Sequence, residues 1–216
     1  KNIAFIPAKG NSERVHCKNL RRLAGKALVR IAAETALDSG IFDVVYVDTE
    51  SDVVWAEVAD LPVKWLRRDP ALATNRTNGN GLLINEIANA EPAENCFMLS
   101  CTTPNLSPDT VYRCVKTFET RPDFDSVISV IELREYLWQH GKPNYDLVDI
   151  PNSFELEPQY METHAIYGIR SVAFEKLQRR IGDDVLFFEV SKFESMDINT
   201  EEDFMLCEML FKVRGV

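Results

Sequence analysis

The residues best suited to bind an anion lie in one loop close to the start of the sequence. An apolar run, Ile3 to Ile6, is followed by Pro7 and then by a polar, basic stretch. Such a run is typical of a buried strand of a parallel sheet, and Pro7 has no N–H to continue it. Glycine and small polar residues can direct several backbone N–H groups into one concavity, where anions bind. The residues predicted to surround the anion are Lys9, Gly10, Asn11, Ser12, Arg14 and Lys18.

The distribution of charge indicates what kind of anion this is. The chain has 24 Lys and Arg against 34 Asp and Glu, a net charge of -10, which argues against nucleic acid as a partner. The first 30 residues nevertheless carry eight basic residues and Glu13 as their single acid. A basic segment after the first strand of an acidic protein favours a small polyanion such as a triphosphate. The alternative is that the arginines pair with acidic helices elsewhere.

Two familiar phosphate-binding motifs are absent from the sequence. There is no G-x-x-x-x-G-K-[ST] loop, and no G-x-G-x-x-G follows the first strand. The sequence therefore excludes a Walker-type loop and gives no support for dinucleotide binding.

Strand-like and helix-like segments alternate along most of the chain, which predicts a single α/β domain over residues 1–216 with a mostly parallel sheet. The ranges predicted as strands are 3–6, 44–47, 62–66, 96–99, 126–131, 165–169 and 185–190. The ranges predicted as helices are 28–39, 52–59, 82–87, 108–118, 171–180 and a terminal helix after residue 199. Polar loops at residues 67–80 and 100–105 follow strands and are candidate walls of a site.

Composition narrows the class further. The chain has 216 residues, of which 45% are hydrophobic, and this is enough to form a soluble globular domain. Because no apolar run is long enough to span a bilayer and the first residues do not resemble a leader, we expect a cytoplasmic protein without a membrane partner. The five cysteines include no C-x-x-C pair, which favours free, mostly buried thiols in a reducing compartment. The three histidines have no spacing typical of zinc ligands.

The alternation fails between residues 132 and 160, where we predict an arm inserted in the domain. This segment carries Leu133, Tyr136, Leu137, Trp138 and Tyr145 among prolines and glycines. It is too apolar for a free loop, so we expect it to bury against a second copy and form a homodimer. The alternative is that the arm folds back on its own domain.

The order of residues from Ile6 to Leu20 resembles the amino-terminal signature of the N-acylneuraminate cytidylyltransferases. These enzymes join CTP to a 2-keto sugar acid and release pyrophosphate with magnesium present. Further similar stretches follow in the family's order: 68–74, 100–104, 125–129 and 195–204. The resemblance implies a Rossmann-like fold of the nucleotide-diphospho-sugar transferase type, a dimer formed through the arm, and Mg²⁺ as cofactor.

The resemblance also implies roles for individual residues. Lys9, Lys18 and Asp197 would be catalytic, and Asp197 and Asn199 would hold the metal. Asn199 has an alternative role as the N-cap of the terminal helix, with Glu202 completing a capping box. Nucleotide contacts are expected at Ala8, Lys9, Gly10, Asn11, Ser12, Arg14, Lys18, Asn19, Arg68, Asn75, Ser100 and Thr102. Contacts to the sugar acid are expected at Thr102, Thr103, Glu162, His164 and Tyr167.

The sequence departs from the family pattern at several of these positions. Glu13, Ser100 and Asn199 replace a frequent Lys, a Gln and an Asp. These changes leave open whether the acceptor is neuraminate or another 2-keto sugar acid. They also motivate an alternative from another class, a nucleotide-binding or scaffold protein that kept the fold and lost turnover.

Overall fold

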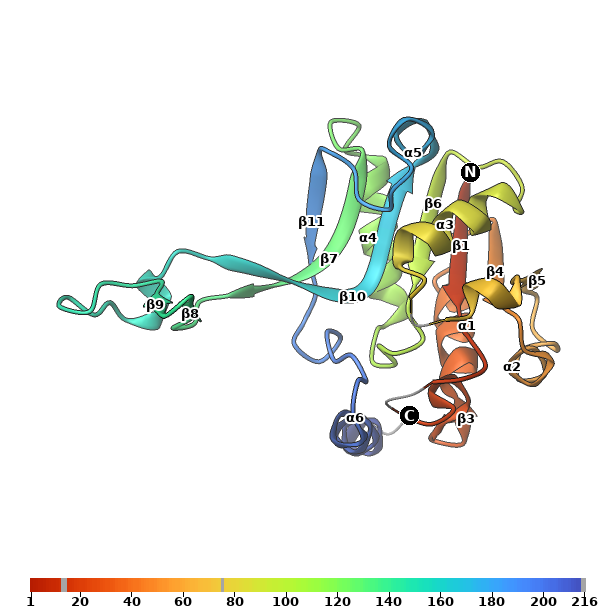
Figure 1. Cartoon of the computed structure of the whole chain (residues 1–216), viewed down its shortest axis with the longest axis horizontal. Coiled ribbons are helices and arrows are strands. Elements are labelled where there is room, and N and C mark those ends of the chain that lie inside the picture. Colours follow the sequence, from red (N-terminus) through yellow and green to blue (C-terminus); the bar gives the residue numbers. More distant parts are fainter. Residues whose placement is uncertain (13–14, 75, 215–216) are drawn as a thin grey trace.

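A seven-stranded sheet forms the centre of the molecule, as seen in the computed structural model, which describes residues 1–12, 15–74 and 76–214 (Figure 1). The strand order is β11-β7-β10-β6-β1-β4-β5. All neighbours are parallel except that β10 runs antiparallel to β6 and β7. The predicted α/β fold with a mostly parallel sheet is therefore confirmed. The strands are β1 (Asn2–Pro7), β4 (Val44–Thr49), β5 (Lys64–Arg67), β6 (Asn95–Leu99), β7 (Ser126–Leu133), β10 (Gln159–Arg170) and β11 (Val185–Glu189).

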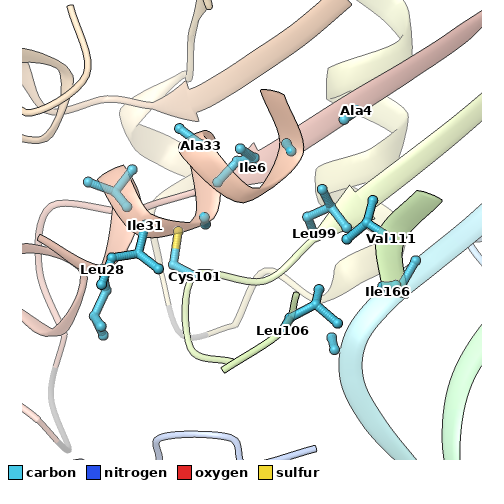
Figure 2. Packing of buried hydrophobic residues seen from close by; sticks show 14 of the residues in the cluster. Ala4, Ile6, Leu28, Ile31, Ala33, Leu99, Cys101, Leu106, Val111 and Ile166 are labelled. Atoms are coloured by element: carbon cyan, nitrogen blue, oxygen red, sulfur yellow. The ribbon is translucent and has the colours of Figure 1, made fainter. Parts of the chain in front are cut away.

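Helices cover both faces of the sheet and divide the core into two clusters. One cluster packs side chains from α1, α2, α4 and α6 against the sheet, and Figure 2 shows part of it around Ile6, Ile31 and Leu99. The other cluster includes Leu83 of α3 and Phe174 of α5. Each fully buried large apolar side chain contributes roughly 1.5–3 kcal/mol to stability. The helices are α1 (Leu28–Asp38), α2 (Asp52–Ala56), α3 (Gly79–Ala88), α4 (Pro108–Glu119), α5 (Ser171–Leu177) and α6 (Glu201–Arg214).

Two helices end earlier than their apolar periodicity predicts. Helix α2 ends at Ala56 instead of residue 59, because the N–H groups of Glu57 and Val58 bond to carbonyls three residues back, which tightens the last turn. Helix α5 ends at Leu177 instead of residue 180, because Gln178 adopts a left-handed conformation with φ of 50°. In the described residues, no helix has the length and apolar character needed to cross a membrane.

The carboxyl ends of the parallel strands meet at one edge of the sheet, which is the lower edge in Figure 1. Strand β1 leaves the sheet after Pro7, as predicted, and the Ala8 N–H still donates to the Asp48 carbonyl at 2.8 Å. The loops after β1, β4, β5 and β6 therefore share this edge, where ligands bind in open α/β sheets.

The segment between β7 and β10 projects from the sheet and carries a hairpin of β8 (Trp138–Gln139) and β9 (Lys142–Pro143) (Figure 1). Its contacts are local: the Asn144 side chain accepts from the Leu137 N–H at 2.9 Å and donates to the Glu135 carbonyl at 3.0 Å. The arm does not fold back on its own domain in this structure, and it leaves Trp138 58% exposed.

All five cysteines are free, and four of them are buried, which confirms the prediction of free, mostly buried thiols. Burial raises the pKa of the Cys101 thiol to about 12 and that of Cys207 to about 11. These thiols stay protonated at neutral pH, so neither acts as a nucleophile.

Two further elements precede α1. A 3₁₀ turn at Lys18–Leu20 ends the first loop, and a short hairpin of β2 (Arg22–Leu23) and β3 (Lys26–Ala27) leads into the helix. Further 3₁₀ turns lie at Pro70–Leu72 and Ser153–Glu155.

Candidate active site

The first loop is fixed from within by Asn19. Its side-chain amide is 7% exposed and donates to the Lys9 carbonyl at 2.9 Å, across the mouth of the loop. Ser12 is also buried, whereas Asn11 is exposed and Ala8 lies fully inside the core. Asn19 thus stabilises the conformation of the loop. Of Ala8, Asn11, Ser12 and Asn19, only Asn11 is exposed to solvent. The predicted nucleotide contact Arg14 lies outside the described residues.

Gly10 makes the closest approach between this loop and the neighbouring strand end. Its N–H donates to Glu50 Oε1 at 2.7 Å, and a Cβ at this position would lie 2.7 Å from the Ser51 Cβ. Only glycine fits there without movement of the backbone. The second carboxylate oxygen of Glu50 is buried without a hydrogen-bond partner in the described part of the chain. One N–H of the predicted anion concavity is therefore already engaged by a carboxylate.

Lys18 ties the first loop to a segment far along the chain. Its Nζ donates to the Ile198 carbonyl at 2.6 Å. Ile198 is fully buried, and its own N–H donates to the Thr102 carbonyl at 2.8 Å. The loops after β1 and β6 and the segment before α6 therefore meet at the predicted site.

Hydroxyl groups from the loop after β6 reach the predicted metal ligand. The Ser100 and Thr102 hydroxyls lie 2.8 Å apart, and Thr102 Oγ1 donates to Asp197 Oδ1. Thr103 differs from them, since it is 2% exposed and donates to the Ser100 carbonyl at 3.3 Å. The geometry thus favours Ser100 and Thr102 over Thr103 as side chains that a ligand can reach.

The prediction that Asn199 caps the terminal helix is wrong. Thr200 precedes α6 and its Oγ1 accepts from the Asp203 N–H at 3.2 Å, while the Asp203 carboxylate accepts from the N–H groups of Asn199 and Thr200, both at 2.8 Å. Thr200 and Asp203 form the capping box, and Glu202 takes no part in it. The Asn199 side chain instead donates to Asp197 Oδ2 at 2.6 Å.

The hydrogen bonds at the start of α6 change the pKa of the Asp203 carboxyl. Burial raises its pKa, but the hydrogen bonds from Asn199 and Thr200, aided by the charge of Lys18, outweigh burial and lower the pKa below its ordinary value. Asp203 therefore stays ionised and stabilises the first turn of α6.

Asp197 presents one carboxylate to the site, with each oxygen already holding a hydrogen bond. In the residues that the structure describes, no group of three or more His, Cys, Asp or Glu could hold a metal by itself. Magnesium commonly takes one or two protein carboxylates and completes its shell with waters and substrate phosphates. The donor set of Asp197, Asn199 and the Thr102 hydroxyl fits magnesium on those terms, with a phosphate ligand required.

Arg68 lies beneath the site and is 3% exposed. Its Nε lies 3.0 Å from both carboxylate oxygens of the fully buried Asp48, and its Nη2 lies 2.5 Å from Asp48 Oδ2. Glu86 is also fully buried beside this pair, and burial, followed by the charge of Asp48, raises its pKa well above the ordinary value. The arginine neutralises the buried carboxylate of Asp48, so most of its hydrogen-bonding capacity is used inside the protein. The other predicted contact in this region, Asn75, lies outside the described residues.

The three residues predicted to contact the sugar from β10 form one cluster. The Tyr167 hydroxyl donates to Glu162 Oε2 at 2.8 Å, and His164 Nδ1 lies 2.8 Å from the same hydroxyl. Strand β10 breaks its register with β7 between Glu162 and Tyr167, and this bulge brings the three side chains together. Burial is the main cause of the raised pKa of the Tyr167 hydroxyl, and the charge of Asp197 makes a smaller contribution, so the cluster lies within electrostatic reach of Asp197.

Four polar residues of the site region were missed from the sequence: Asp48, Glu50, Glu86 and Arg180. Asp48 and Glu50 stand at the carboxyl end of a predicted strand, so the rule that singled out the loop after β1 could have found them. Glu86 and Arg180 carry no such signal, because each reaches the site region only through packing of a helix or a loop on the sheet.

Two solved structures with this fold are named for nucleotide chemistry. A CMP:2-keto-3-deoxy-manno-octonic acid synthetase in complex with CTP superposes with a TM-score of 0.72 at 16% identity, covering 99% of both chains. A nucleotidyl transferase from Methanothermobacter thermautotroptrophicus has a TM-score of 0.69 at 17% identity and covers 100% of this chain and 99% of its own. At such identities the likeness shows the fold.

Curated relatives share sequence over nearly the whole chain. An N-acylneuraminate cytidylyltransferase of Streptococcus agalactiae serotype III (strain NEM316) is 23% identical over 95% of this chain and 52% of its own length. The CMP-N,N'-diacetyllegionaminic acid synthase of Legionella pneumophila (strain Philadelphia 1) is 26% identical over 98% of this chain and 96% of its own. The chain spans about half the length of the first of these relatives and nearly all of the second.

A profile described as cytidylyltransferase matches residues 3–206, from the first strand into the terminal helix. The match includes the basic first loop, the loop after β6 and the segment of Asp197, which are the parts that the structure brings to one edge of the sheet. The chain belongs to the cytidylyltransferase family, as the resemblance predicted.

Proposed function

We propose that this chain joins CTP to an acidic 2-keto sugar and releases a CMP-sugar and pyrophosphate. The observation that carries the proposal is the pair of contacts between the first loop, the loop after β6 and the Asp197 segment. Lys18 Nζ donates to the Ile198 carbonyl, and Thr102 Oγ1 donates to Asp197. Cations, hydroxyls and a carboxylate thereby converge where open α/β sheets bind their ligands.

The reaction follows from where charge develops. The anomeric hydroxyl of the sugar acid attacks the α-phosphate of CTP, a new P–O bond forms, and the bond to the bridging oxygen breaks as pyrophosphate leaves. Negative charge grows on the phosphate oxygens, and fixed cations stabilise it. Lys9 and Lys18 supply these cations, with Asn11, Ser12, Ser100 and Thr102 as further donors to the nucleotide.

Magnesium would complete the site once CTP is bound. Asp197 and Asn199 would hold the ion together with phosphate oxygens. Bound magnesium would neutralise charge on the triphosphate and help to orient it. The amide of Asn199 already lies 2.6 Å from Asp197, so a small rotation could turn its oxygen toward a cation.

The acceptor is proposed as sialic acid or a related ulosonic or nonulosonic acid. The names of the relatives support this class, since they specify N-acylneuraminate, N,N'-diacetyllegionaminic acid and 2-keto-3-deoxy-manno-octonic acid. The cluster of Glu162, His164 and Tyr167 offers hydrogen-bonding groups of the kind that sugar hydroxyls need.

We further propose that the arm forms a homodimer in a reducing cytoplasm. The arm leaves apolar side chains exposed, among them Phe154 at 71% and Val148 at 97%, and a second copy would bury them. The five free thiols suit a reducing compartment. Sedimentation at micromolar concentration should give a dimer. A monomer under those conditions would contradict this assignment.

A pyrophosphate-release assay tests the proposed function. Each of CTP, GTP, UTP and ATP is paired with a panel of 2-keto sugar acids, with Mg²⁺ present. We expect release with CTP and at least one acid, and no release without the acid. If no pair releases pyrophosphate although calorimetry detects CTP binding, the chain is a nucleotide-binding or scaffold protein instead.

A further inference from the structure

The bulge in β10 holds an exposed histidine in an unusual conformation. His164 has φ of 59°, in the left-handed region that only a few per cent of residues other than glycine adopt, with asparagine, aspartate and histidine the most frequent among them. Such conformations persist only where the surrounding structure imposes them, and they concentrate at functional sites. Bulges likewise re-aim a side chain beside an active site. The backbone conformation therefore indicates that the orientation of the His164 side chain matters for function.

The hydrogen bonds of Tyr167 determine which nitrogen of His164 carries the proton. A tyrosine hydroxyl has one proton, and this one is donated to Glu162 at 2.8 Å. His164 Nδ1, 2.8 Å from the same oxygen, must then be the donor of the second hydrogen bond. In the neutral imidazole this leaves Nε2 without a proton and able to accept one.

The environment keeps the Tyr167 hydroxyl protonated. Tyr167 is 4% exposed, and burial raises the pKa of its hydroxyl well above the ordinary value, against the opposing charge of Arg180. The charged groups that face the cluster are Glu162 from its own strand, Arg180 from the loop before β11, and Asp197 from the segment before α6. The hydroxyl therefore remains a donor to Glu162 across the physiological pH range.

Arg180 lies on the other side of the same tyrosine. Its guanidinium carbon is 3.8 Å from the centre of the Tyr167 ring, and its side chain packs against Gly79, where a Cβ would collide with it. A cavity of about 310 Å³ opens beside it, between the start of α3 and residues 179–182. In the described parts of the chain no carboxylate lies within ion-pair distance of Arg180, although neighbouring Arg179 pairs with Asp183.

The separation of His164 and Arg180 allows an acceptor carbon that carries both a carboxylate and a hydroxyl. The His164 and Tyr167 ring centres are 6.2 Å apart, which puts the Arg180 guanidinium at most about 10 Å from the imidazole centre. In the cyclic form of a 2-keto sugar acid, the carboxylate and the anomeric hydroxyl share one carbon. With a hydrogen bond at each end, that unit spans a gap of roughly this size.

We propose that His164 Nε2 is the general base for the anomeric hydroxyl of the acceptor and that Arg180 binds the carboxylate on the same carbon. This inference rests on the proposed function. Tyr167 and Glu162 are positioning residues, because they hold the tautomer and orientation of the imidazole without touching the reacting atoms.

The proposed step transfers one proton to the imidazole and exchanges one P–O bond for another. The hydroxyl oxygen forms a bond to the α-phosphorus, and its proton moves to His164 Nε2. The bond between the α-phosphorus and the bridging oxygen breaks, and its electron pair leaves with pyrophosphate. The imidazolium then releases the proton to solvent, which His164 reaches because it is exposed.

His164→Asn tests the base, because asparagine tolerates the left-handed backbone and lacks a basic group. We expect kcat to fall about a hundredfold or more, the typical contribution of general base catalysis, while CTP affinity stays unchanged. The acidic limb of the pH profile of kcat should disappear. His164→Gly should be partly rescued by added imidazole. Activity of His164→Asn within twofold of wild type, with an unchanged pH profile, would overturn the assignment.

Arg180→Met tests the carboxylate contact, with Arg179→Met as a matched control. We expect Arg180→Met to raise KM for the sugar acid tenfold or more with a smaller change in kcat, and Arg179→Met to change neither by more than twofold. Equal effects of the two substitutions would contradict a specific contact.

NMR can determine which nitrogen of His164 carries the proton, and it does not require enzymatic turnover. The ¹⁵N shifts of His164 in the ligand-free protein should report a protonated Nδ1 and an unprotonated Nε2, and Tyr167→Phe should remove this preference. A protonated Nε2 in wild type would overturn the inference. If wild type turns over no acid, the proposed function fails, and the base role fails with it. If wild type is active and His164→Asn is too, only this inference fails.

Discussion

The proposed nucleotide half and the proposed acceptor half of the site are built in different ways. In the nucleotide half, the hydrogen bond from Lys18 Nζ to the Ile198 carbonyl joins segments 180 residues apart in the sequence, and Ile198 is fully buried. In the acceptor half, Glu162, His164 and Tyr167 lie within six positions of one strand and depend on a local bulge. For the proposed site, this difference implies that substitutions in the acceptor half leave the contacts of the nucleotide half in place.

The largest effect should come from Asp197→Asn, which removes the carboxylate that the nucleotide half contributes to magnesium. We expect magnesium-dependent turnover to fall to below about one part in a thousand, since metal neutralisation of phosphate charge is lost, while CTP still binds weakly. Steady-state kinetics at varied magnesium measures this. Asn199→Asp is the control and should stay active. Normal turnover of Asp197→Asn at limiting magnesium would contradict the metal assignment.

Arg68→Leu should have the next largest effect, on stability. It leaves the buried carboxylate of Asp48 without its cation, which typically costs about 3–5 kcal/mol. Urea unfolding measures the loss. Arg67→Leu, one residue earlier and with a 64% exposed side chain paired to Asp52, should cost less than about 1 kcal/mol. A similar small cost for Arg68→Leu would mean that the pair does not support the nucleotide half.

Lys18→Ala should lower kcat about a hundredfold, because one preorganised charged donor in the transition state is worth about 3 kcal/mol. KM for the sugar acid should stay nearly constant, since the acceptor half is untouched. Lys176→Ala, an exposed lysine on α5, is the control. A Lys18→Ala variant within twofold of wild type would show that this lysine only links two segments.

The smallest predicted effect distinguishes the contributions of Thr200 and Asn199 to the stability of α6. Thr200→Ala should lower the free energy of unfolding by about 1 kcal/mol, because the Asp203 N–H loses its cap. Asn199→Ser should leave helix stability unchanged, since the Asn199 side chain contacts Asp197 instead. Thermal unfolding decides this. A larger loss for Asn199→Ser than for Thr200→Ala would restore the capping role to Asn199.

Much of the fold could be predicted because the signals are local. Apolar runs such as Ile3 to Ile6 mark buried strands, and Ser107 followed by Pro108 marks the start of α4, where the Ser107 hydroxyl accepts from the Thr110 N–H. The full length of β10 could not be predicted, because its outer half at Gln159 to Glu162 pairs with β7 beyond the core and lacks a buried apolar run.

The charges of the first 30 residues show that an excess of basic residues in the sequence does not by itself indicate an anion site. Five of the eight cations, three of them arginines, pair with acids outside this segment, so much of its excess positive charge is neutralised in the fold. The basic residues that form these pairs are Lys1, Arg21, Arg22, Lys26 and Arg30. The net charge of this segment therefore does not by itself predict an anion site.

In the acceptor half, the residues could be named by resemblance, but their arrangement could not be derived. No sequence pattern predicts the register shift between Glu162 and Tyr167 or the positive φ of His164, because both depend on how β7 and β10 pair. Arg180 reaches Tyr167 from a loop that packs over Gly79, a contact that only tertiary structure creates.

The most direct test of the account is ³¹P NMR of the wild-type protein with CTP, Mg²⁺ and a 2-keto sugar acid. If the two halves form one site, a single new phosphodiester signal and pyrophosphate should appear in equal amounts, and neither should appear when the acid is omitted. Release of pyrophosphate with free CMP and no phosphodiester, or no reaction with any acid of the panel, would contradict the claim that the two halves act as one cytidylyltransferase site.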